Sequence, residues 1–180
     1  SIVFQPRWLQ ANCNCSFQTL KDEASLCSNC NTITERSHMN NARHITLPAG
    51  FTAAGVTCGI KASGNKDLAI IASDTEASTA IVTTRNQIVG APITWCRTIL
   101  PRGYGKTRGM VINAGVSNVC TGDQGLKNAK IMAEETAGRI GAEPEQIIVA
   151  STGVIGHQLP MGKVKRGIAS TAKTLGRRRD

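Results

Sequence analysis

The stretch IIVASTGVIGHQLPM, residues 147–161, marks the sharpest change of structure along the chain. Its β-branched opening predicts a buried strand over residues 147–150, which a loop at residues 151–156 follows. Thr152 and Gly153 follow shortly after. Because glycine lets another group approach the backbone closely, a Thr-Gly step can aim a hydroxyl and a main-chain N–H at one point. Such a pair suits a negatively charged oxygen, although by local chemistry alone an ordinary strand-to-helix corner explains it equally well.

Amphipathic helices are predicted on both sides of this stretch. Between residues 121 and 140 small and apolar side chains recur at helical spacing, and Gly141 is placed to end the helix. Thr121 and Gln124 have the spacing of a capping box. The second helix begins at about Pro160. Its apolar face holds Met161, Val164, Ile168, Thr171 and Leu175. Helix, strand and helix in this order indicate a layered α/β fold.

The segments before residue 121 read mainly as strands. Residues 51–63 alternate small and apolar side chains and lead into a turn at residues 64–67. Short β-branched runs follow, and the first two of them predict a hairpin or meander. The strand candidates are residues 68–73, 78–84, 92–100 and 109–115.

The composition is that of a soluble protein with one domain, or one domain and a tail. The chain has 180 residues, of which 41% are hydrophobic and 3% aromatic, so its core is built from Ala, Val, Ile and Leu. No apolar stretch reaches the length of a membrane span, and no charged-then-apolar signal segment opens the chain. We therefore expect a cytoplasmic protein with no membrane partner.

A net charge of +9 raises the possibility of a nucleic-acid partner. The positive charge is concentrated between residues 163 and 179, and no aromatic residue follows Tyr104. Sites for single-stranded nucleic acid usually interleave basic groups with stacking aromatics. We therefore predict a solvated basic helix and no nucleic-acid partner.

The chain has seven cysteines, an odd number that a complete disulfide framework cannot use. Four of them fall in the first thirty residues: Cys13, Cys15, Cys27 and Cys30. Their C-x-C…C-x-x-C spacing permits a tetrahedral zinc site. The other three are Cys58, Cys96 and Cys120, which we interpret as small core residues.

Residues 1–38 differ from the rest of the chain, with many polar residues and no sustained periodicity, and the texture changes at Met39. They form either a small zinc-stabilised module or a disordered extension. We prefer the extension, drawn as residues 1–45 and without a metal, and place the folded domain at residues 46–180.

Three segments taken together resemble the ornithine acetyltransferase/glutamate N-acetyltransferase family of arginine biosynthesis. They are AAGVTCGIKASGNKDLAII (53–71), NAGVSNVCTGDQG (113–125) and ASTGVIGHQLPM (150–161). The resemblance implies a layered αββα sandwich of the kind shared with self-processing aminopeptidases, present here in incomplete form. It implies acetyl transfer from N2-acetylornithine to glutamate without a bound cofactor, and some members also accept acetyl-CoA as a donor.

The resemblance also implies a mechanism. Family members cleave themselves before a threonine into α and β chains, which assemble as an α2β2 heterotetramer. The new N-terminal threonine is the nucleophile and forms an acetyl-enzyme. Matching the motif residue by residue places Thr152 and Gly153 in the oxyanion hole, with Ser151 supporting the turn. For Asn113 and Asn118 we expect structural roles.

Two further polar residues, Lys61 and His157, lie within or beside the matching segments. For Lys61 we expect a solvated ammonium, and for His157 no base function. The cleavage threonine of the family lies well beyond residue 180. We therefore expect most of an α-chain that is inactive by itself. Two alternatives stay open: an N-terminal-nucleophile aminopeptidase of similar fold, and a basic module that binds zinc or nucleic acid.

Overall fold

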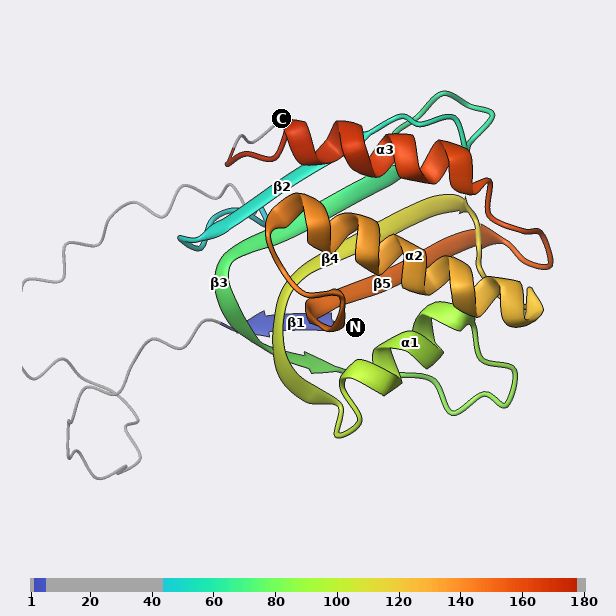
Figure 1. Cartoon of the computed structure of the whole chain (residues 1–180), viewed down its shortest axis with the longest axis horizontal. Helices are drawn as coiled ribbons and strands as arrows, with labels where there is room; N and C mark the ends of the chain where they lie inside the picture. The colour runs from blue at the N-terminus through green and yellow to red at the C-terminus, as the bar shows by residue number, and fades with distance from the viewer. Residues whose placement is uncertain (1, 6–43, 178–180) are drawn as a thin grey trace, which may run out of the picture. The chain divides into compact units, whose positions relative to one another are not determined.

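The computed structural model describes residues 2–5 and 44–177, and these form one sheet with helices (Figure 1). The strands are β1 (Ile2–Gln5), β2 (Phe51–Val56), β3 (Leu68–Ile81), β4 (Tyr104–Val116) and β5 (Ile147–Val154). The helices are α1 (Ala91–Ile99), α2 (Gly122–Ile140) and α3 (Met161–Lys173), with a short 3-10 turn at Pro144–Gln146.

Strand β3 organises the sheet. It pairs antiparallel with β4 along one edge, and along the other edge with β2 through its first half and with β1 through its second half. Strand β4 pairs in parallel with β5, and helix α2 connects the two as a βαβ unit. The three antiparallel pairings and the parallel pairing therefore give a mixed sheet.

The hairpin predicted over residues 68–84 is wrong, because this segment is one continuous strand. Both halves of β3 pair with β4, and the register shifts between Ala72 and Ala77. The polar residues 74–76, which lie between the two predicted strands, are exposed at this irregularity. An irregularity of this kind bends a strand without ending its pairing.

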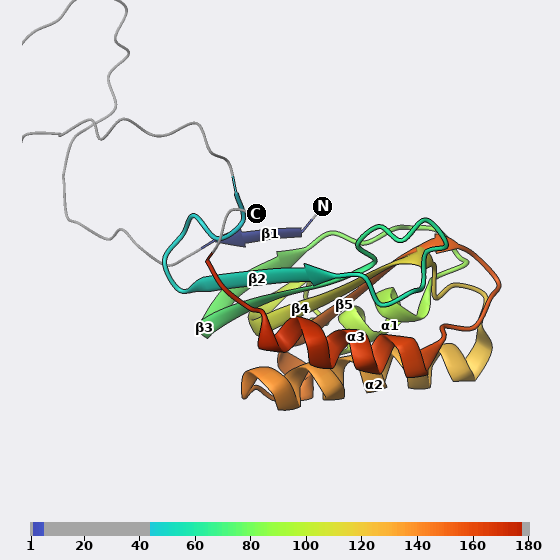
Figure 2. The same ribbon diagram turned by 90° about the horizontal axis from the view of Figure 1, so that it is seen from above.

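Helices α2 and α3 cover one face of the sheet (Figure 2). Alternate strand residues such as Ile70 and Val111 point to this face and are fully buried. They pack in one cluster with Met132 of α2 and Ile168 of α3, which are fully buried as well. The predicted helices and the predicted strand at 147–150 are confirmed, and the helical layer on one sheet is half of an αββα sandwich.

The strand predicted at residues 92–100 is wrong, because residues 91–99 form helix α1. Pro92 lies in the first turn, where the ring's fixed φ suits a helix start. The Trp95 Nε1 donates a hydrogen bond to the main-chain carbonyl of Ile147 at 2.9 Å, and the Cys96 thiol donates to that of Val149 at 3.4 Å. Helix α1 therefore lies along the outer edge of β5 and satisfies carbonyls there.

The helix predicted from residue 121 is present, but its capping box is not formed. The Thr121 hydroxyl donates to Oδ1 of Asn118 at 2.6 Å instead of accepting from the helix, and Nε2 of Gln124 donates to Oδ1 of Asn128 at 2.9 Å. Among the residues that the structure describes, no side chain caps this end of α2. Gly141 ends the helix in the left-handed conformation, as predicted.

The amino-terminal cysteines, with the zinc hypothesis that rests on them, lie outside the described residues. The extension predicted over residues 1–45 falls mostly there too, although Ile2–Gln5 is described and pairs with β3. Within the described ranges, Cys96 is buried, Cys58 is half-buried and Cys120 is exposed, so the prediction of a core position for Cys120 is wrong. No helix in the described part of the chain is long and apolar enough to cross a membrane.

Candidate active site

Thr152 and Gly153 lie in the last part of β5, where the sequence predicted a loop. They pair with Ala114 and Gly115 of β4. Both residues are exposed, and no hydrogen bond joins the Thr152 hydroxyl to any residue in the described ranges. Neither residue is sealed in the core, so the hydroxyl is available to a ligand.

The Thr152 side chain points away from helices α2 and α3. Val149 belongs to the cluster under these helices, and Ser151, two residues on, points to the same face. Ala150 packs with the cluster on the opposite face, and Thr152 follows it there by the same alternation. In an αββα sandwich this opposite face is the one that meets the second sheet.

Gly153 lies too close to β4 for any side chain. Its φ is +129°, and a Cβ built on it would lie 2.3 Å from the carbonyl carbon of Gly115. Gly115 itself has a φ of +111°. Only glycine tolerates this combination of positive φ and close backbone approach. The main-chain direction at Gly153 is therefore fixed by its contact with β4.

Hydrogen bonds join the end of β5 to the start of α2. The Ser151 hydroxyl donates to the carbonyl of Val116 at 3.1 Å and accepts from the N–H of Asn118 at 3.0 Å. Asn118, fully buried, donates through Nδ2 to the carbonyl of Gly125 at 2.9 Å and accepts from Thr121. These bonds confirm the structural roles predicted for Ser151 and Asn118.

Asn113 is fully buried and pairs with Ser151 in register. Its Nδ2 donates to the carbonyl of Val116 at 2.8 Å, while Oδ1 accepts no hydrogen bond from the residues that the structure covers. Asn113 therefore holds the turn that follows β4, as predicted.

Asp67 is a buried carboxylate that the sequence analysis missed, because it reads as the last residue of a polar turn. Only 2% of it is exposed. Burial alone would raise its pKa, but hydrogen bonds from the N–H groups of Cys58, Lys61 and Ile60, together with the Cys58 thiol, bring the pKa down to about 2. The buried Asp67 carboxylate therefore holds the backbone of residues 58–61 close to the ends of β4 and β5.

The other candidate side chains near this end do not gather at Thr152. The pKa of the Cys58 thiol is raised to about 11, mainly by burial and further by the hydrogen bond to Asp67 and its negative charge. The thiol is therefore not an activated nucleophile. The Lys61 ammonium donates to the carbonyl of Lys66 at 3.1 Å. His157 is exposed, and no hydrogen bond joins it to any residue in the described ranges.

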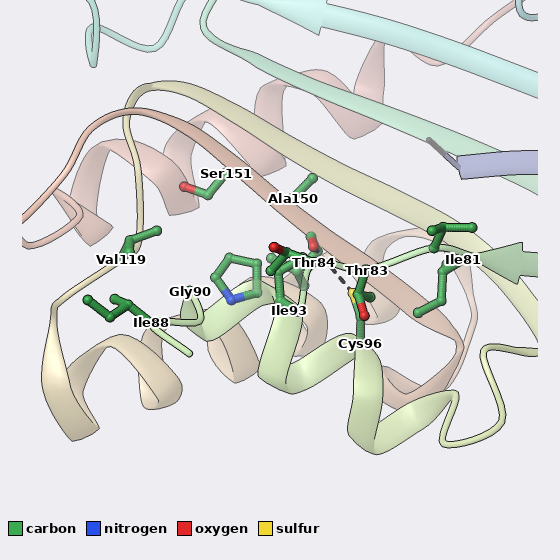
Figure 3. Close-up of a pocket in the computed structure, with 13 residues that line it drawn as sticks. Ile81, Thr83, Thr84, Ile88, Gly90, Ile93, Cys96, Val119, Ala150 and Ser151 are labelled. Carbon is green, nitrogen blue, oxygen red and sulfur yellow. Dashed lines mark hydrogen bonds between the residues drawn. The ribbon is translucent and has the colours of Figure 1, made fainter. Parts of the chain in front are cut away.

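A cavity of about 300 Å³ lies beside the outer edge of β5, and Ser151 is the last residue of β5 in its lining (Figure 3). Figure 3 shows Val119 and Ile88 at one end and Ile81 at the other. The described residues that line this cavity are mostly apolar, and the one thiol among them, Cys96, has its pKa raised by burial. The cavity adjoins the Thr-Gly pair without including it and offers no acid–base group.

Solved structures define the class of protein to which this fold belongs. An ornithine acetyltransferase from Mycobacterium tuberculosis, solved in complex with ornithine, matches with a TM-score of 0.72 and 37% identity, over 77% of this chain and 74% of that chain. The arginine biosynthesis bifunctional protein from Bacillus halodurans matches with a TM-score of 0.68 and 34% identity, over 73% and 69%. The fold is that of ornithine acetyltransferases, as the sequence predicted.

Comparison of sequences then gives the family. The ArgJ family matches residues 52–179. The arginine biosynthesis bifunctional protein ArgJ of Thermotoga neapolitana is 44% identical over 131 residues, which are 73% of this chain and 33% of that protein. Its Bacillus subtilis counterpart is 42% identical over 130 residues, 72% and 32%. The chain belongs to the ArgJ family, and it spans about a third of the length of these relatives.

Proposed function

We propose that residues 46–180 form the α-chain part of an enzyme that transfers an acetyl group from N2-acetylornithine to glutamate. The products are ornithine and N-acetylglutamate, within arginine biosynthesis. Family membership supports this proposal, as does the likeness to an acetyltransferase that was solved with ornithine. The observation that carries it is the Thr152 hydroxyl beside Gly153 at the end of β5, which is exposed and has no hydrogen-bond partner among the residues that the structure describes.

In this proposal Thr152 and Gly153 stabilise the negative charge that develops on the acetyl oxygen. A hydroxyl oxygen attacks the acetyl carbonyl carbon, and the carbonyl oxygen becomes an oxyanion. The Thr152 hydroxyl and the Gly153 N–H donate to it, so their worth is greatest in the transition state. The close contact between Gly153 and Gly115 supports the role, because donors that are held in place need no reorganisation during the reaction.

The nucleophile in this mechanism lies beyond residue 180. It is the N-terminal threonine of the enzyme's own β-chain, whose α-amine takes up the hydroxyl proton. The C–N bond of acetylornithine breaks, the proton passes to the leaving amine, and ornithine departs from the acetyl-enzyme. The amine of glutamate then attacks the ester and restores the free threonine.

A partnership of cleaved α and β chains accords with the lengths of the relatives. This chain covers 74% of the solved Mycobacterium tuberculosis chain but only 33% of the curated Thermotoga protein. The solved chain is thus shorter than a full-length relative, as a cleaved chain would be. Assembly as α2β2, acetyl-CoA as a second donor and a cytoplasmic location stay predictions.

Ornithine release from N2-acetylornithine tests the proposed reaction. The complete protein that contains this chain should release ornithine in proportion to added glutamate and should form N-acetylglutamate. Equal release without glutamate would indicate hydrolysis and favour the aminopeptidase alternative. The 180-residue chain alone should release none, and activity in it would contradict a nucleophile beyond residue 180.

A further inference from the structure

The carboxylate of Asp67 organises the turn that follows β2. It accepts hydrogen bonds from the main-chain N–H groups of Cys58 at 2.7 Å, Ile60 at 2.6 Å and Lys61 at 3.0 Å. Such charge-assisted bonds are stronger than bonds between neutral groups. Residues 58–61, hereafter the Asp67 turn, are therefore wrapped around one buried charge.

Helix α3 holds the Asp67 turn from one side. The Lys163 ammonium donates to the carbonyl of Gly59 at 2.7 Å. Gly167 leaves room for Cys58, since a Cβ on Gly167 would lie 2.8 Å from the Cβ of Cys58. The loop between β2 and β3, which contains the Asp67 turn, lies at the end of the sheet where β4 and β5 end (Figure 1).

The Asp67 turn packs against β4 next to the proposed oxyanion hole. A Cβ built on Gly115 would lie 3.0 Å from Cγ2 of Ile60 and 3.1 Å from Cγ of Lys61, so no side chain fits between them without a shift. Gly115 in turn is the residue against which Gly153 packs. The carbonyl of Asp67 also accepts a hydrogen bond from the N–H of Ala114 at 2.8 Å, and Ala114 is the register partner of Thr152.

We propose that Asp67 is a positioning residue, which fixes Gly115 through the Asp67 turn and thereby aims the Thr152 hydroxyl and the Gly153 N–H at the reacting carbonyl. The inference rests on the proposed function. Asp67 touches no reacting atom in this scheme. Its two routes to β4 are independent, one through its carboxylate and the turn and one through its main chain.

Steady-state kinetics of Asp67→Asn in the complete protein tests this role. The amide keeps the size of the side chain but lacks the charge and one of the two acceptor oxygens, so the turn loosens. We expect kcat to fall by about 10- to 100-fold, because small displacements of catalytic donors have effects of this size. KM should stay within about two-fold, since substrate binding is not altered. The matched control is Asp74→Asn. Asp74 is an exposed carboxylate in the middle of β3, at the register shift between Ala72 and Ala77, and its variant should behave as wild type.

A double-mutant cycle with Thr152→Ala separates positioning from a general loss of structure. If Asp67 acts through the oxyanion hole, the double variant should lose clearly less than the product of the two single losses. Multiplicative losses, a change in KM alone, or wild-type kcat in Asp67→Asn would overturn the proposal. Wild-type kcat in Thr152→Ala would instead refute the proposed function, whatever Asp67→Asn does.

Ile60→Ala covers the case in which Asp67→Asn does not fold, as judged by near-UV circular dichroism. This variant keeps the carboxylate and its three donors and removes the part of the Ile60 side chain that lies against Gly115 and the core. It should lower kcat at unchanged KM. Wild-type kcat in a folded Ile60→Ala protein would overturn the route through the turn.

Discussion

Substitution of Gly153 by alanine gives the sharpest prediction of stability. A φ of +129° is rarely adopted by residues with a side chain and costs about 1–3 kcal/mol. The new Cβ would lie 2.3 Å from the carbonyl carbon of Gly115, and because this neighbour is backbone it cannot rotate away. Overpacking of this kind adds about 1–3 kcal/mol. We expect Gly153→Ala to lower the free energy of unfolding by about 4 kcal/mol. This is a large share of the total free energy of unfolding of a typical protein, which is about 5–15 kcal/mol.

Gly138→Ala is the matched control for this substitution. Gly138 is exposed in α2, and in the described part of the chain no atom beyond its chain neighbours and its own helix backbone lies within 4 Å of where its Cβ would be. Alanine there should raise the free energy of unfolding by about 0.5–1 kcal/mol, because glycine loses more backbone entropy in a helix. The same chemical change is thus expected to have opposite signs at the two positions.

Urea denaturation followed by far-UV circular dichroism measures both variants. Equal slopes with urea concentration would show that the midpoints report stability alone. If Gly153→Ala is as stable as the wild-type chain, Gly153 does not pack on Gly115 as described, and the rigid main-chain donor is refuted with it.

Three further outcomes are expected. Since the pKa of Asp67 is lowered from 3.8 to about 2 on folding, its charge stabilises the fold above pH 4. About 2 kcal/mol should be lost as the pH falls from about 4 to 2, and urea titrations of Asp67→Asn should lack this loss. Trp95→Phe should cost about 1 kcal/mol in the same assay, because the β5 carbonyl loses its donor. Maleimide labelling of the native protein, read by peptide mass spectrometry, should follow the exposure of each thiol. Exposed Cys120 should react fast, half-buried Cys58 slowly and buried Cys96 only on unfolding. Fast labelling of Cys96 would contradict the position of α1.

Helices α2 and α3 and the buried start of β5 were predictable because their signals are local. The apolar spacing of α2 and the glycine at its end act within one segment. Helix α1 also has a local signal, the proline at residue 92, but the segment was predicted as a strand. What decides the helix is its position at the edge of β5, where Trp95 and Cys96 find carbonyls. That edge is set by strand pairing, which local sequence does not show.

The candidate site was predictable only in part for the same reason. The Thr152-Gly153 step was identified from residue types and family likeness, whereas its strand conformation depends on pairing with β4. Asp67 looked like a turn residue, because in sequence it follows Gly64, Asn65 and Lys66. Its burial arises from residues 58–61 folding back on it, and such a long-range contact has no periodic signal.

The turnover number of Thr152 variants in the complete protein measures what the Thr152 hydroxyl contributes to acetyl transfer. Thr152→Ala removes the hydroxyl donor and should lower kcat by about 10²- to 10³-fold at nearly unchanged stability. Thr152→Ser keeps a hydroxyl and should retain most of the activity. A Thr152→Ala enzyme that turns over acetylornithine and glutamate as fast as the wild type would show that the Thr152 hydroxyl does not stabilise the oxyanion.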